Sequence, residues 1–143
     1  MEDFVPFELA VKLNEKGYPQ HICEHAYITR DDEENERYVL GDREYIPFIP
    51  DYLPTIASPT ISQVLKWLRK EKRIFVAINI GYCYESDEIP FPTNTKMEPI
   101  LKGYYYGIWE LDNLNDKNGC SEYFEKPELA ALAGIEYVID NLI

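Results

Sequence analysis

The feature that most constrains the fold is a helical pattern that runs directly into an apolar stretch, over residues 58–80. Thr60, with Gln63 three residues later, fits a capping box that starts a helix. Residues 74–80 are almost all apolar, which is typical of a strand covered on both faces or central in a sheet. The pattern predicts a helix over 58–72 that covers neighbouring β-structure with one aliphatic face. That face consists of Ile61, Val64, Leu65 and Leu68.

Two further segments have helical patterns. Residues 6–16 begin with Pro6, which suits a first turn, and are followed by Gly17, which suits the position after a helix. Residues 127–141 repeat apolar side chains at helical spacing. Asp140 in the last turn is unfavourable for the helix dipole, so we expect this end to fray.

Tyrosine and β-branched residues predict the strands. Residues 25–29 and 37–40 flank a polar, acidic turn, which is a hairpin signal. Residues 103–111 form an aromatic strand, which we expect to pair antiparallel with the strand at 74–80 because no helix signal lies between them. The proline-rich segment 41–59 predicts an extended, ordered crossing on the core.

These elements predict a single domain of the α+β class over residues 1–143. A chain of 143 residues can bury a self-sufficient core. An apolar content of 45% argues against a disordered chain. We expect one antiparallel sheet of three to five strands, with about three helices packed mainly on one of its faces.

Charge is distributed unevenly along the chain. The net charge is −12, yet residues 58–73 hold five basic residues and one acid, so the remainder carries −16. Such a field repels nucleic acid and anionic membranes and attracts a basic partner. It also supports solubility, and that alternative stays open. A DNA-recognition role for the helix at 58–73 is disfavoured, because a +4 segment makes few phosphate contacts.

The cysteine count favours a reducing compartment. Three cysteines at irregular spacing do not make a disulfide framework. The first residues lack the basic start and apolar run of a signal peptide. No apolar run approaches the length of about 20 residues that a membrane helix needs. We therefore expect a cytoplasmic protein that does not bind a membrane.

One cluster has metal-ligand chemistry. His21, Cys23 and His25 alternate, so an extended segment would place all three on one face. Imidazole and thiolate suit zinc, although this is not a zinc-finger spacing. The alternative is a strand with one buried cysteine and two surface histidines. Because a nucleophile elbow and a glycine-rich phosphate loop are both missing, an enzyme is disfavoured and no cofactor is expected.

Two groups of residues are candidates for binding a protein partner. The first is an acidic run and the second is a set of tyrosines on the two central strands. The alternative for the tyrosines is cross-strand packing that holds the sheet, and this is favoured. The candidates are Asp31, Asp32, Glu33, Glu34, Tyr82, Tyr84, Tyr104 and Tyr106.

Residues 57–69 and 128–143 resemble an uncharacterised family of short bacterial proteins that often occur among prophage and mobile-element genes. The resemblance implies a shared fold and a phage-related setting, and it brings no activity or catalytic residue.

The leading hypothesis is a non-enzymatic, acidic accessory protein that presents carboxylates to a basic protein partner. The alternative is a small metal-binding protein that uses His21, Cys23 and His25. The identity of the partner and the oligomeric state stay open.

Overall fold

The computed structural model contains three helices and six strands in the part of the chain that it describes. The described residues are 3–20, 25–32, 35–42, 55–84, 99–112, 115–116 and 122–143, with the backbone alone for 28–32, 35–42, 84 and 115–116. In chain order the elements are α1 (Phe7–Glu15), β1 (His25–Asp32), β2 (Asn35–Asp42), β3 (Thr55–Ala57), α2 (Ile61–Glu71), β4 (Ile74–Tyr84), β5 (Pro99–Glu110), β6 (Asn115–Asp116) and α3 (Pro127–Asn141).

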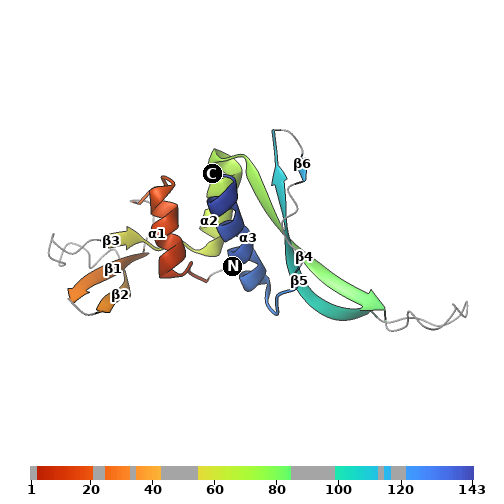
Figure 1. Cartoon of the computed structure of the whole chain (residues 1–143), viewed down its shortest axis with the longest axis horizontal. Coiled ribbons are helices and arrows are strands. Elements are labelled where there is room, and N and C mark those ends of the chain that lie inside the picture. Colours follow the sequence, from red (N-terminus) through yellow and green to blue (C-terminus); the bar gives the residue numbers. More distant parts are fainter. Residues whose placement is uncertain are drawn as a thin grey trace, which may run out of the picture.

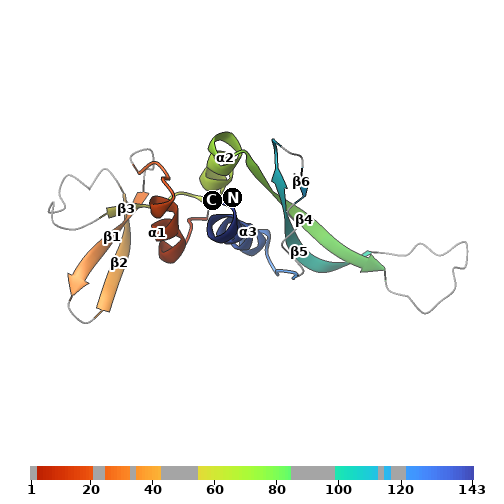
Figure 2. The ribbon, with the colours of Figure 1, turned by 45° about the horizontal axis from the view of Figure 1, so that its top comes forward.

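The α+β class is confirmed, and the described strands form two antiparallel sheets. Their orders are β2-β1-β3 and β4-β5-β6. The three helices lie between the two sheets in both ribbon views (Figures 1 and 2). The expected single sheet is replaced by two because α2 separates the two groups of strands in the chain. Each group then pairs with its nearest neighbours in sequence.

The expected helix over 58–72 is present as α2. It starts at Ile61 because Thr60 is its N-cap, with an extended backbone at ψ 160°. The capping box is complete. Thr60 Oγ1 accepts a hydrogen bond from the Gln63 N–H at 3.3 Å, and Gln63 Oε1 accepts one from the Thr60 N–H at 2.9 Å. The aliphatic face points inward as expected. Ile61, Val64 and Leu68 are fully buried, and Leu65 is half-buried.

The β4–β5 hairpin and α3 form one side of the core. The two strands pair antiparallel as expected, with Val76 opposite Ile108. Both side chains are buried, together with Ile135 and Val138 of α3. The helix approaches the sheet closely at Gly134.

The hairpin expected near residues 25–40 is also present. β1 and β2 pair antiparallel with Asp32 opposite Asn35, and β3 adds to the other edge of β1. Most of the proline-rich segment lies outside the described residues. Its final part is ordered on the core, where Ser58 and Pro59 are buried.

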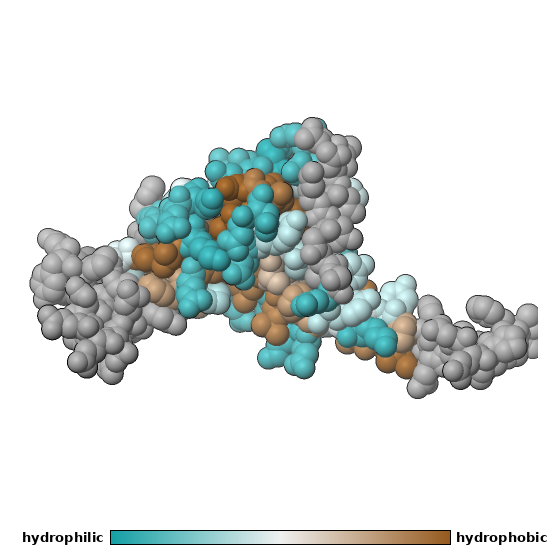
Figure 3. Space-filling model, in the orientation of Figure 1, coloured by the Kyte–Doolittle hydropathy of each residue, from teal (hydrophilic) through white to brown (hydrophobic). Residues whose placement is uncertain are grey.

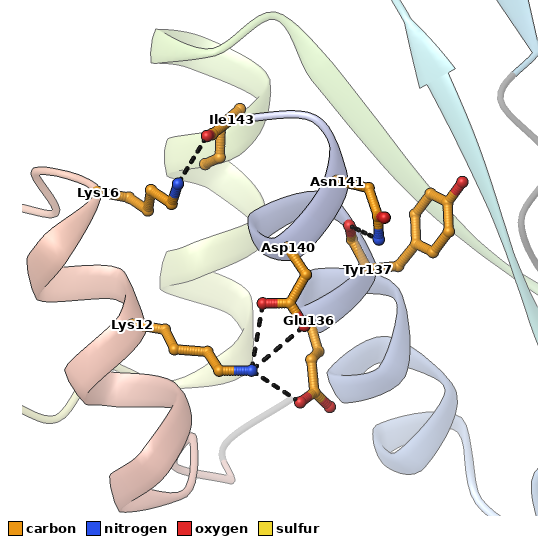
Figure 4. A network of polar contacts seen from close by, with 7 residues as sticks. All are labelled: Lys12, Lys16, Glu136, Tyr137, Asp140, Asn141 and Ile143. Atoms are coloured by element: carbon orange, nitrogen blue, oxygen red, sulfur yellow. Dashed lines mark hydrogen bonds and ion pairs between the residues drawn. The ribbon is translucent and has the colours of Figure 1, made fainter.

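The sequence predicts fraying at the C-terminal end of α3, and this prediction is wrong. The helix stays regular through Asn141 because its acidic side chains bind α1 (Figure 4). Lys12 Nζ lies 3.1 Å from Glu136 Oε1 and 3.2 Å from Asp140 Oδ1. These hydrogen bonds, the one to Glu136 first, raise the pKa of Lys12 above its ordinary value. Asp140 thus joins two helices.

Gly134 should tolerate no branched side chain. A Cβ there would lie 2.7 Å from Val76 Cγ1 and 3.1 Å from Tyr106 Cγ. Gly134→Val should therefore lower the free energy of unfolding by about 2 kcal/mol or more, because overpacking displaces the core. Urea denaturation measures this loss. Val76→Ala should relieve part of the clash, giving an interaction free energy of about 1 kcal/mol in the double-mutant cycle. Strictly additive losses would contradict this packing.

The Lys12 cluster should give a pH dependence at high pH. A lysine whose pKa is raised by folding stabilises the protein below its unfolded pKa of 10.5 and loses that effect as pH rises through the folded value. The difference in unfolding free energy between wild type and Lys12→Gln should therefore be constant at neutral pH and shrink above 10.5. Urea titrations across this range measure it, and a difference independent of pH would disprove the assignment.

Candidate interaction surface

The structure describes only one residue of the metal-ligand cluster His21, Cys23 and His25. His21 and Cys23 lie outside the described residues. His25 is half-buried at the start of β1, and its ring centroid lies 4.7 Å from that of Phe4. Within the described ranges, no three histidine, cysteine or acidic side chains come together as a metal site. Zinc binding therefore stays a prediction.

The acidic run is located only by its backbone. Asp31 and Asp32 are the last two residues of β1, and Asp31 is opposite Glu36 of β2. Glu33 and Glu34 lie outside the described residues. The run thus begins within the last two residues of β1.

The four candidate tyrosines lie in different environments. Tyr106 is 7% exposed, and its ring packs between those of Phe124 and Tyr137, so it belongs to the core. Tyr104 is half-buried, and its backbone pairs with Phe124. Tyr82 is 58% exposed. Tyr84 ends β4, and its side chain lies outside the description.

One face of β4 changes from buried to exposed along its length. Alternate residues of a strand share a face. On the face that meets α3, Val76 is 6% exposed and Ile78 is half-buried, whereas Ile80 is 60% and Tyr82 is 58% exposed. The core face of the hairpin therefore continues into solvent.

β5 completes this exposed surface. Tyr104 is opposite Ile80, and Leu101, 56% exposed, is opposite Tyr82. The register shifts beside Gly81, so that Lys102 is the extra residue and Leu101 keeps its place across from Tyr82. We call Ile80, Tyr82 and Leu101 the arm strip.

The arm strip is exposed because the helices do not reach it. In both ribbon views the far half of the β4–β5 hairpin extends beyond the helices (Figures 1 and 2). Hydrophobic residues are visible along this arm (Figure 3). An apolar strip that continues a core face is typical of a binding surface.

Comparisons of the chain with protein-family models, curated proteins and solved structures found no match. In the described part of the chain, the helices are too short or too polar to cross a membrane.

Two of the three arm-strip residues were not among the sequence candidates. Ile80 and Leu101 are aliphatic, and an apolar strand pattern predicts burial. The lengths of the observed elements explain their exposure, and the expected strand over 103–111 did not include Leu101. Twelve strand residues span about 40 Å, whereas the 15 residues of α3 span about 22 Å. One helix of this length cannot cover such a strand.

Substitutions in the arm strip should leave the fold stable. Ile80→Thr and Leu101→Thr keep a residue suited to strands and should change the free energy of unfolding by no more than about 1 kcal/mol. Ile108→Thr, at a fully buried position of β5, should cost about 3 kcal/mol. Urea denaturation compares the three. Equal losses at all three positions would show that the arm strip is packed against the protein.

Proposed function

We propose that the protein is an accessory protein that binds a basic protein partner through the arm strip. The observation that carries this proposal is the exposure of Ile80, Tyr82 and Leu101 on the continuation of a core face. Ile80 and Leu101 are more than half exposed and so forgo part of the stabilisation that full burial of an aliphatic side chain gives, about 1.5–3 kcal/mol. A partner protein that covers these side chains would provide that stabilisation.

The charge of the chain supports a basic partner. Residues 85–98, which connect β4 to β5, contain four acidic residues and one lysine. The acidic run at 31–34 adds four more carboxylates. Apolar contact would provide affinity, and the acidic field would speed encounter with a positively charged protein.

The setting is part of the same proposal. A cytoplasmic location is supported by Cys83, which is a free thiol. A role in a prophage or another mobile element rests on the resemblance of residues 57–69 and 128–143, and the genes that flank this one would test it.

Affinity capture from a host lysate with matched variants tests partner binding. The wild type at about 0.05 M salt should retain proteins of high isoelectric point that are lost at about 0.5 M salt. The double variant Ile80→Thr/Leu101→Thr should reduce their retention by at least about tenfold, because central apolar contacts dominate binding energy. Quantitative mass spectrometry measures both effects.

Phe75→Thr is the control. Phe75 lies on the opposite face of β4 and is 38% exposed, so the substitution removes exposed apolar area outside the arm strip. It should leave retention unchanged. Equal capture by wild type and the double variant, or capture of acidic proteins alone, would refute the proposal.

A further inference from the structure

A second surface has the opposite charge to the rest of the molecule. An open cleft of about 610 Å³ lies between α2 and the turn after α1. We call its buried and half-buried lining residues, Tyr18, Pro19 and Trp67, the floor of the cleft. Its edge consists of the exposed residues Lys66, Lys70 and Lys72, with Glu71 as the lining carboxylate. All three lysines come from the basic segment at 58–73.

The floor of the cleft is held by an aromatic contact and a backbone hydrogen bond. The Tyr18 and Trp67 rings meet edge to face, with centroids 5.2 Å apart. The chain reaches this position through Gly17, whose φ of +87° suits glycine. The Tyr18 N–H then donates to the Leu13 carbonyl at 3.0 Å. A preformed wall of this kind loses little entropy when a ligand binds.

The lysines at the edge form no ion pair with the residues that the structure describes. Among the described residues, Lys12 and Arg73 form ion pairs with carboxylates, whereas the three cleft lysines form none. Lys72 Nζ instead lies 5.4 Å from the centre of the Trp67 ring. Lys66 and Lys70 are four residues apart on α2, a spacing at which like charges repel.

The helix dipole accounts for only part of this arrangement. Positive charge is favourable in the last turn of a helix, which includes Lys70 and precedes Lys72. Lys66 lies a full turn earlier in the helix, so the helix dipole stabilises its charge less. A bound anion would neutralise all three charges together.

We propose that this cleft binds a small polyanion that carries an aromatic ring, with a nucleoside triphosphate as its representative. Lysine ammonium groups bind phosphate as point charges. The ring would lie against Pro19 and the part of Trp67 that is exposed in the cleft, 9% of that residue. The volume of about 610 Å³ is in the range of small-molecule sites, about 300–1,000 Å³.

Charge distribution selects a small ligand over a nucleic acid strand. Outside residues 58–73 the chain carries −16. Because the screening length is about 10 Å, a compact polyanion in the cleft interacts mainly with the charges of the cleft lysines. A long polyanion would extend over the acidic surface and be repelled. This inference concerns a different surface from the arm strip, so either can fail alone.

Fluorescence of Trp67 tests the site directly. The chain has two tryptophans, so a Trp109→Phe background leaves Trp67 as the reporter. ATP without divalent metal should change this signal saturably. Lys66→Gln/Lys70→Gln should weaken ATP binding at least about tenfold, because two charge-assisted contacts are lost.

The matched control is Lys102→Gln/Lys126→Gln, which removes the same charge from two exposed lysines outside the cleft. It should leave the ATP affinity within about twofold. Equal weakening by both pairs would show general electrostatic attraction and overturn the proposal.

Other probes define the ligand class. Inorganic triphosphate should bind more weakly than ATP, and adenosine should not saturate. A thymidine oligonucleotide should bind more weakly than ATP. Failure of ATP to bind, equal binding of triphosphate, or tighter binding of the oligonucleotide would each overturn the proposal.

Discussion

Burial of the α2 aliphatic face holds the centre of the molecule together. Ile61, Val64 and Leu68 are fully buried, and α2 packs against both β4 and α3. Only Lys72 and Arg73 separate the helix from β4, and Arg73 has a left-handed φ of +57°. That conformation costs an L-residue about 1–2 kcal/mol. Packing on both sides sustains it, and the Arg73 carbonyl accepts a hydrogen bond from the Leu111 N–H at 2.9 Å. The same packing directs the lysines of α2 outward.

Local signals predicted the helices and the hairpins well. The capping box at Thr60 and the bounds of α3 follow from interactions within a few residues, which a sequence displays directly. The division into two sheets depends on which strands meet in space, and propensity does not encode that. The end of α3 shows the same limit. Asp140 is unfavourable for its own helix but binds Lys12, more than a hundred residues away.

The candidate surfaces were harder to predict because burial depends on the neighbours of a residue. Tyr82 and Tyr106 occupy the same face of one hairpin, yet they are 58% and 7% exposed. The difference is set by how far α3 extends along the strands. The basic cleft required a second element as well. The lysines stood out in the sequence, but Tyr18 joins them only because Gly17 turns the chain after α1.

The two surfaces are able to act independently. The cleft borders α1, whereas the arm points away from the helices on the other side (Figure 1). The cleft residue Lys72 precedes β4, and the strand rises about 27 Å from Ile74 to Tyr82, more than twice the screening length of about 10 Å at 0.1 M salt. A polyanion in the cleft would therefore change the field at the arm very little. A basic partner would be attracted by the acidic remainder and repelled only close to the cleft, so the uneven charge orients its approach toward the arm.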